Sequence, residues 1–180
     1  MSRIRITGGK WRSRVIKVID AQGLRPTPDR VRETLFNWLG QDLSGLTCLD
    51  LFAGSGILGF EAASRGAASV VLVEWDRRAA VTLRENVESL GGNGVELIRT
   101  DALEFAARAA RQGRSFDLVF LDPPYRQQWL DRVWPLLPAI IAPGGQIYVE
   151  AETEVAPPAP WRIVRQGRAG QVYYHLLERE

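Results

Sequence analysis

The ten residues Asp50–Gly59, which read DLFAGSGILG, decide the fold that the rest of the chain must adopt. The apolar run TCLDLF (47–52) predicts a strand, the glycines after it predict a turn, and ILG opens a helix. Glycine lets the backbone take a positive φ and approach a ligand with no Cβ in the way. The amides at a helix start can then bind an anionic group. The stretch therefore predicts a ligand site at the end of a strand.

Downstream of this turn, apolar runs alternate with helical segments. Runs of this length without strict alternation suit strands that are buried on both faces of a parallel sheet. The predicted strands are TCLDLF (47–52), SVVLVEW (69–75), GVELIR (94–99), FDLVFLD (116–122) and QIYVEA (146–151), with helices near 57–65, 77–91 and 102–112. A terminal hairpin is predicted from 162–166 and 171–177. Repeated βα units favour a Rossmann-like α/β fold, with a mostly parallel, seven-stranded sheet whose last strand is antiparallel.

The first 26 residues are predicted to form a basic β-hairpin extension before the main domain, residues 27–180. Residues 3–7 and 11–19 alternate in part, and Gly8-Gly9 lies between them. Residues 1–32 hold nine Lys and Arg against two Asp, although the whole chain has a net charge of only +2. Such an arm suggests a docking surface for a polyanion, although a merely solvated hairpin would have the same composition. The candidate RNA contacts are Arg3, Arg5, Lys10, Arg12 and Arg14.

A loop at 20–26 and then a helix are expected to follow the hairpin. Thr27-Pro28 predicts the start of this helix, with the threonine as its cap and the proline in its first turn. Apolar residues at helical spacing continue to Gly40, which is expected to end the helix. These apolar residues are Val31, Leu35, Trp38 and Leu39.

Acidic residues end three successive predicted strands, and ligands of open α/β sheets bind at such strand ends. Asp50 precedes the glycine turn, where a carboxylate suits the amino group of a bound amino acid better than a pyrophosphate. Glu74 can accept both hydroxyls of a ribose, although an exposed acid at a strand end looks the same in sequence. Asp101-Ala102 can bind an adenine, or Asp101 can simply cap the next helix. The candidate cofactor contacts are Asp50, Gly54, Ser55, Gly56, Glu74, Asp101 and Ala102.

The segment DPPY (122–125) follows the fourth predicted strand and carries the candidate chemistry. Prolines stiffen the turn and donate no backbone hydrogen bond, so their carbonyls remain available as acceptors. An exocyclic amine has two N–H donors, and the Asp122 carboxylate and Pro123 carbonyl can each accept one. Tyr125 can stack on the base, which contributes on the order of 1–3 kcal/mol. Asp122, Pro123 and Tyr125 are therefore the candidate catalytic residues, against the alternative of a purely structural Pro-Pro turn.

The composition excludes several classes of protein. Hydrophobic residues make up 46% and charged residues 24% of the chain, which is typical of a globular protein. Cys48 is the single cysteine, so no internal disulfide can form, and we expect it to be a buried core residue. One cysteine and one histidine make a Cys/His zinc site implausible. No apolar stretch is long enough to span a bilayer and no secretory signal is recognisable, so we expect a cytoplasmic protein.

The motifs DLFAGSG, VEWD, TDAL and DPPY together resemble those of class I methyltransferases that act on amino groups of bases. Further segments narrow the resemblance: ITGGKWRSR, LRPTPDRVRETLFNWL and the tail RQGRAGQVYYHLLER. With them, nearly the whole chain is similar to the RsmD-type ribosomal RNA guanine-N2 methyltransferases of bacteria. DPPY alone is shared with many other methyltransferases, so the N-terminal segments are the more specific part of the resemblance.

The resemblance implies a Rossmann-like class I methyltransferase fold, S-adenosylmethionine as cofactor and no metal. It implies methylation of N2 of one guanine in 16S ribosomal RNA, within the 30S subunit or a late assembly intermediate. We expect a monomer that does not bind a membrane. Carried over by motif position, the candidate cofactor residues would bind S-adenosylmethionine, and Asp122, Pro123 and Tyr125 would hold the guanine.

Three other functions fit part of the sequence. A DNA adenine-N6 methyltransferase could use the same DPPY site, but no separate target-recognition region is apparent. An NAD-dependent oxidoreductase would explain the match of Gly54, Gly56 and Gly59 to G-x-G-x-x-G, which is a weak signal alone. It would leave DPPY without a role. A non-catalytic RNA-binding module would explain the basic arm and leave the acidic series unexplained.

Overall fold

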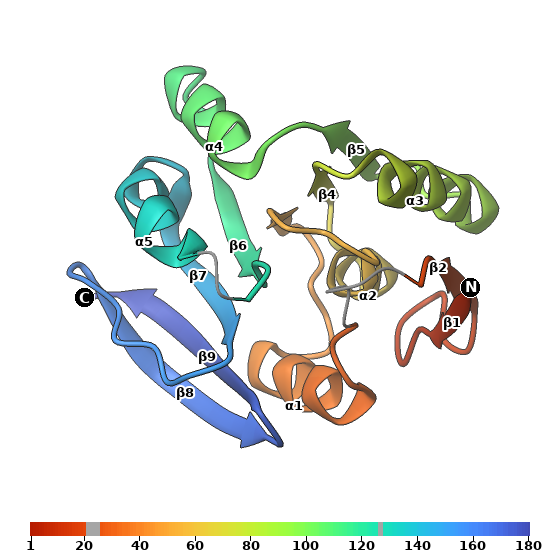
Figure 1. The fold of residues 1–180 in the computed structure, drawn as a ribbon, viewed down its shortest axis with the longest axis horizontal. Helices are drawn as coiled ribbons and strands as arrows, with labels where there is room; N and C mark the ends of the chain where they lie inside the picture. The colour runs from red at the N-terminus through yellow and green to blue at the C-terminus, as the bar shows by residue number, and fades with distance from the viewer. Residues whose placement is uncertain (21–25, 126–127) are drawn as a thin grey trace.

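A computed structural model describes residues 1–20, 26–125 and 128–180 of the chain. Its main sheet has seven strands in the order β5-β4-β3-β6-β7-β9-β8 (Figure 1). The strands are β3 (Thr47–Asp50), β4 (Ser69–Glu74), β5 (Val95–Arg99), β6 (Phe116–Leu121), β7 (Ile141–Ala151), β8 (Trp161–Ala169) and β9 (Val172–Arg179). Strands β3 to β7 pair in parallel, and β9 is antiparallel to both of its neighbours. The predicted fold class, including the antiparallel last strand, is confirmed.

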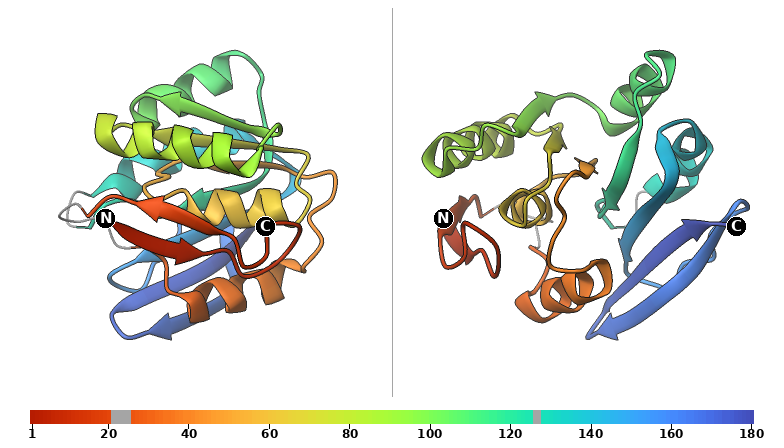
Figure 2. Two further views of the ribbon diagram at one scale, coloured as in Figure 1. Left: turned by 90° about the vertical axis from the view of Figure 1, so that its right-hand side faces the viewer. Right: turned by 180° about the vertical axis from the view of Figure 1, so that it is seen from behind.

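Helices cover both faces of this sheet because successive strand residues point to opposite sides. The helices are α1 (Asp29–Leu39), α2 (Ile57–Ser64), α3 (Arg77–Leu90), α4 (Ala102–Arg111) and α5 (Trp129–Val133), with a 3₁₀ helix η1 (Trp134–Ala139). Leu118 and Phe120 pack with the apolar residues of α1, α2 and α3, and Val119 and Leu121 pack with those of α4, α5 and η1. Figures 1 and 2 show the sheet between these two layers. Helices α5 and η1 were not predicted from the sequence.

The N-terminal hairpin is shorter than predicted and packs closely on the main domain. Its strands are β1 (Ser2–Arg5) and β2 (Val15–Val18), and it lies against α2 beside α3 (Figure 2, left). Its apolar side chains belong to the same core cluster as the α1–α3 face of the sheet: Ile6, Trp11, Ile16 and Val18. The hairpin therefore contributes to the core. The division of the chain into an extension, residues 1–26, and a main domain, residues 27–180, remains a prediction.

The turn of the hairpin is seated on the end of α2. Lys10 N donates to Ser64 O at 2.8 Å, and Trp11 N donates to Ser64 Oγ at 2.9 Å. Gly9 has a φ of +78°, and a Cβ at this position would lie 2.0 Å from Ser64 O. Glycine is needed here both for the backbone angle and for the close approach of two chain segments.

A buried ionic cluster joins the hairpin, α1 and α2. The Glu61 carboxylate accepts hydrogen bonds from Arg32 Nη1 at 2.6 Å and Arg65 Nη1 at 2.5 Å, and from the amide and hydroxyl of Thr7. The side chains of Arg32 and Glu61 are both completely buried. Arg32 also pairs with Asp29 in the first turn of its own helix. A buried charge of this kind is tolerated only when it is paired and hydrogen-bonded.

Thr27 does not cap α1 as the sequence predicted. The cap position is Pro28, without a side-chain cap hydrogen bond, and the Thr27 hydroxyl instead donates to Glu150 Oε2 at 2.5 Å. The Thr27 hydroxyl thus makes a tertiary hydrogen bond instead of the helix-cap hydrogen bond that the local sequence predicted. The predicted loop at 20–26 lies mostly outside the described residues. None of the described helices is long and apolar enough to cross a membrane.

The ionic cluster leads to a prediction about stability. Replacing Glu61 with Gln should lower the free energy of unfolding by about 3–5 kcal/mol, because it leaves two buried arginines short of their negative partner. Urea unfolding followed by circular dichroism measures this loss. Glu85→Gln, at an exposed position of α3, is the matched control and should change stability by less than about 0.5 kcal/mol. Equal stability of the two variants would contradict a central role for Glu61.

Candidate active site

The carboxyl ends of five parallel strands meet at one edge of the sheet, and an acidic residue ends or directly follows nearly every one. Asp50 and Glu74 end β3 and β4, Asp122 directly follows β6, and Glu150 is the penultimate residue of β7. Asp101 comes two residues after β5. Ligands of open α/β sheets bind at this edge, so the structure groups the candidate residues where a site is expected.

The glycine turn after β3 is fixed by Glu74. Gly54 and Gly56 have φ values of +54° and +80°, which explains why glycine occupies both positions. Glu74 Oε1 accepts from Gly54 N at 2.8 Å, and Oε2 accepts from Asp76 N at 2.7 Å. Burial is the main cause that raises the pKa of Glu74, and these amide hydrogen bonds oppose it. Glu74 therefore braces the glycine turn from the end of β4.

Asp50 lies beneath the turn. Asp50 is only 2% exposed. Its Oδ2 accepts a hydrogen bond at 3.2 Å from the amide of Gly59, in the first turn of α2. Burial raises the pKa of Asp50 to about 7, and the Gly59 amide opposes this shift. Ser55 is also buried, and its Oγ accepts from Ile57 N at 3.2 Å. Both polar side chains thus hold the start of α2.

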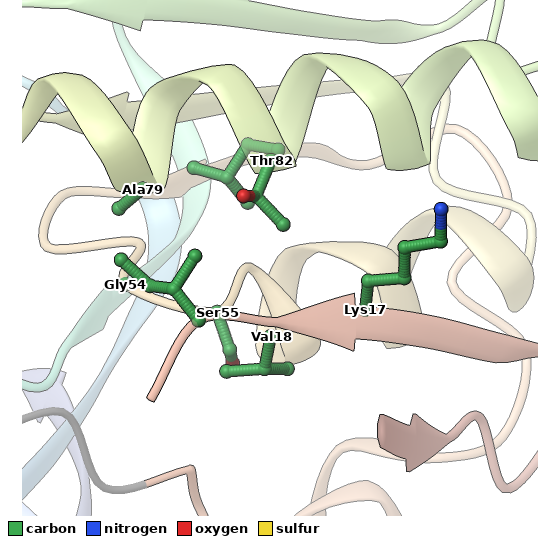
Figure 3. Close-up of a pocket in the computed structure, with 8 residues that line it drawn as sticks. Lys17, Val18, Gly54, Ser55, Ala79 and Thr82 are labelled. Carbon is green, nitrogen blue, oxygen red and sulfur yellow. The ribbon is translucent and has the colours of Figure 1, made fainter. Parts of the chain in front are cut away.

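The flank of the turn is closed by β2 and α3. Figure 3 shows Ala79 and Thr82 of α3 on one side of Gly54 and Ser55, and Val18 of β2 on the other. The cavity between them has a volume of about 10 Å³, which is room for about one water molecule. This cavity is far too small for a nucleoside. The hairpin and α3 therefore support the turn from behind.

Asp101 caps α4, which is one of the two roles that the sequence left open. Its side chain accepts from Glu104 N at 3.0 Å. Ala102 follows it as the first residue of the helix and is buried. The neighbouring amide of Thr100 donates to Glu74 O at 3.2 Å, which holds this segment beside the end of β4. The cap leaves Asp101 at the same edge as Glu74, and its binding role remains a prediction.

Asp122, Pro123 and Tyr125 follow β6 in the middle of the sheet edge. Pro123 is buried, and Asp122 and Tyr125 are partly buried. The register pairs Leu121 with Val149, so Asp122 comes next to Glu150 on the neighbouring strand. Burial is the main cause that raises the pKa of the Asp122 carboxyl well above its usual range, and the nearby charges of Glu150 and Asp50 add to it.

Glu150 was not among the site residues predicted from the sequence. It is 3% exposed, and burial raises its pKa to about 7, while the hydrogen bond from Thr27 acts in the opposite direction. The signal was present, since the predicted strand QIYVEA carries an acid near its end as the earlier strands do. Only the register of the sheet shows that this acid and Asp122 are neighbours.

The predicted RNA contacts of the hairpin do not all lie near these acids. Arg3, Arg5, Lys10, Arg12 and Arg14 are all exposed. Lys10 N is bonded to the last residue of α2, and Arg14 Nη2 donates to Ser89 O near the end of α3. Both helices begin at the acidic edge, so their last turns lie toward the opposite edge of the sheet. The structure therefore separates Lys10, Arg12 and Arg14 from Asp122.

Comparison with known proteins identifies the family. Residues 4–178 match the protein family described as "Conserved hypothetical protein 95". Ribosomal RNA small subunit methyltransferase D of Escherichia coli (strain K12) is 44% identical, over 99% of this chain and 91% of that protein. The Haemophilus influenzae protein of the same name is 40% identical, over 97% and 93%. The chain belongs to this RsmD family.

A solved structure supports the same relationship. A putative methyltransferase from E. coli has a TM-score of 0.88 and 44% sequence identity, and the alignment covers 99% of both chains. Membership confirms the family resemblance seen in the sequence. Among residues 1–20, 26–125 and 128–180, no group of three or more His, Cys, Asp and Glu side chains is arranged to hold a metal ion.

The burial of Asp50 leads to a prediction about pH. Its pKa is raised from 3.8 to about 7, so the folded protein binds a proton more tightly than the unfolded chain does. The stability that this proton adds is fully present below about pH 4 and is lost as the pH rises to about 7. The loss is at most about 4 kcal/mol, because one pKa unit corresponds to about 1.36 kcal/mol.

Denaturant unfolding at several pH values measures this dependence. Asp50→Asn keeps a side-chain acceptor for Gly59 N and removes the ionisation, so its stability should fall less between pH 4 and 7 than that of the wild type. Asp131→Asn, at an exposed position of α5, should keep the wild-type slope. An unchanged slope in Asp50→Asn would show that Asp50 ionises normally.

Proposed function

We propose that this chain transfers a methyl group from S-adenosylmethionine to N2 of a guanine in 16S ribosomal RNA. The observation that carries the proposal is the DPP turn at an acidic sheet edge, in a member of a family of ribosomal RNA small subunit methyltransferases. The proposed substrate is the 30S subunit or a late assembly intermediate, and the proposed active form is a monomer.

The residues at the edge fit S-adenosylmethionine. The positive φ angles of Gly54 and Gly56 expose backbone to a ligand, and Glu74 carries two oxygens suited to the ribose hydroxyls. Ala102 presents an amide at the start of α4, where Asp101 is available for the adenine amino group. Asp50 and Ser55 would contribute indirectly, because both are committed to the start of α2.

The proposed chemistry depends mainly on positioning. S-adenosylmethionine supplies a methyl group that is already activated. The guanine must leave its stack to reach the site. The Asp122 carboxyl and the Pro123 carbonyl would each accept one N2 hydrogen, which aims the nitrogen lone pair, and Tyr125 would stack on the base. Holding the reacting groups in this geometry lowers the entropic part of the barrier.

The exposed cations of the hairpin are proposed to contact RNA phosphates. Phosphate contacts fix the position of a nucleic acid and carry no sequence information. Because Lys10 and Arg12 lie toward the far edge of the sheet, they would bind RNA away from the target base. Deleting residues 1–18 would not test this role, since it would remove Ile6, Trp11 and Ile16 from the core. Single substitutions of exposed cations are the appropriate test.

Glu74 leads to a prediction about the cofactor. Glu74→Gln should weaken S-adenosylhomocysteine binding by about 1–3 kcal/mol, because it removes charged acceptors from the ribose and loosens the Gly54 turn. Isothermal titration calorimetry measures the affinity. Glu96→Gln, on the exposed side of β5, should bind like the wild type. Wild-type affinity in Glu74→Gln would remove Glu74 from the cofactor site.

Asp122 leads to a prediction about catalysis. Asp122→Ala should lower the single-turnover rate on 30S subunits by at least about 100-fold while retaining cofactor affinity, because its contact strengthens in the transition state. Transfer of tritiated methyl groups is measured on naked 16S RNA, 30S subunits and DNA, with nucleoside analysis of the product. Near-normal rates in the variant would make DPPY a structural turn. Methylated adenine in DNA would favour the DNA methyltransferase alternative.

Arg12→Glu provides a contrast in the same assay. This substitution should raise the RNA concentration needed for half-maximal rate and should reduce the salt dependence of methyl transfer, without changing the rate at saturation. An unchanged salt dependence would mean that the hairpin does not contact RNA. The two variants therefore separate a loss of chemistry from a loss of docking.

A further inference from the structure

Three segments that are distant in the sequence meet at a pair of carboxyl groups, of which Glu150 is buried and Asp122 is partly buried. Asp122 follows β6, Glu150 lies near the end of β7, and Thr27 precedes α1. The register of β6 and β7 makes the two acids neighbours, and the nearby charge of Glu150 helps to raise the pKa of Asp122. Thr27 and Glu150 are each 3% exposed, and the Thr27 hydroxyl donates to Glu150 Oε2 at 2.5 Å.

Two neighbouring carboxylates have no donor between them, so they can hydrogen-bond to each other only when one of them holds a proton. Two adjacent buried anions would also repel each other strongly. The other titratable groups that act on the pair are Asp50 on β3 and Tyr148 on β7, and neither supplies a positive charge. The Thr27 hydroxyl has a single proton, and it uses this proton to donate a hydrogen bond to Glu150. Because Glu150 Oε2 already accepts from Thr27, we assign the proton of the pair to Asp122, with Glu150 as its acceptor.

We propose that Glu150 is a positioning residue that completes a proton relay through Asp122 during methyl transfer, an inference that rests on the proposed function. In this step the N2–CH3 bond forms, the S–CH3 bond of the donor breaks and sulfur keeps its electron pair. The amine proton passes to the free oxygen of Asp122, and the proton already on Asp122 moves to Glu150. The pair thus goes from one proton to two, and later returns one to solvent.

The relay explains why an acid with a raised pKa stands in a site that needs an acceptor. A protonated Asp122 keeps one oxygen free to accept the N2 hydrogen, and Glu150 prevents the extra proton from remaining there. The pKa of Glu150 is about 7, which suits a group that must accept a proton near neutral pH and then release it. The relay requires an ionised Glu150, so the rate should fall as the pH drops through this pKa.

The first test is single-turnover methyl transfer to 30S subunits at several pH values. Glu150→Gln should be about 100-fold slower at saturating RNA and should lose the neutral inflection of the pH profile, with unchanged S-adenosylhomocysteine affinity. Glu154→Gln, an exposed residue in the loop after β7, should behave like the wild type. A Glu150→Gln rate within twofold of the wild type would overturn the relay.

Thr27 provides a second test that does not depend on the stability of Glu150→Gln. Thr27→Val removes the hydrogen bond that lowers the pKa of Glu150, so the rise of the rate with pH should move to higher pH. Thr27→Ser keeps the hydroxyl and should restore the wild-type profile. Identical pH profiles for Val and Ser at this position would also overturn the relay.

A readout without turnover comes from nuclear magnetic resonance of protein labelled with ¹³C at glutamate carboxyl groups. The free wild-type protein should show one glutamate that titrates near neutral pH, and this titration should be missing only in Glu150→Gln. Its absence from the wild type would overturn the inference. A wild type that titrates as expected but methylates no RNA would instead overturn the proposed function, so the two failures are distinguishable.

Discussion

The structure depends on a single buried carboxylate, Glu61 of α2. Burying a charge is costly unless every oxygen is paired, so Arg32, Arg65 and Thr7 must all stay in contact with it. This requirement places α1, α2 and the hairpin relative to one another. It also reaches the candidate site, because Arg32 Nε donates to Thr27 O at 3.1 Å while the Thr27 hydroxyl donates to Glu150. One ionic cluster in the core thereby fixes the threonine whose hydroxyl contacts Glu150.

A parallel sheet concentrates acidic residues at one edge, and each acid here is accommodated differently. Glu74 and Asp50 accept backbone amides of the glycine turn and of α2, and Asp101 accepts an amide of α4. Such hydrogen bonds stabilise the ionised form of a carboxyl group. Glu150 has the Thr27 hydroxyl as its partner instead, and Asp122 lies next to it on the neighbouring strand. The acids at this edge therefore differ in their partners: three accept backbone amides, and one accepts a threonine hydroxyl.

The repeating pattern of apolar runs was sufficient to predict the sheet, because each buried strand and each helix leaves a local signature. Asp50, Glu74 and Asp122 could be placed at strand ends for the same reason. Thr27 was misread because its local sequence fits a helix cap equally well, and only the tertiary contact with Glu150 decides between the two. Glu150 itself was overlooked because adjacency of β6 and β7 is a property of the register, which one sequence does not display.

The hairpin shows why charge alone is an incomplete guide to function. Its cations are exposed, as composition suggested, but its alternate residues Ile6, Ile16 and Val18 are core residues of the whole domain. The same segment therefore serves packing on one face and is available for polyanion binding on the other. Helix α2 has eight residues and spans about 12 Å, with Gly56 at one end and Ser64 at the other. A phosphate bound near Lys10 and a base held at Asp122 would consequently belong to different nucleotides, so RNA that uses both must extend across the α1–α3 face of the domain.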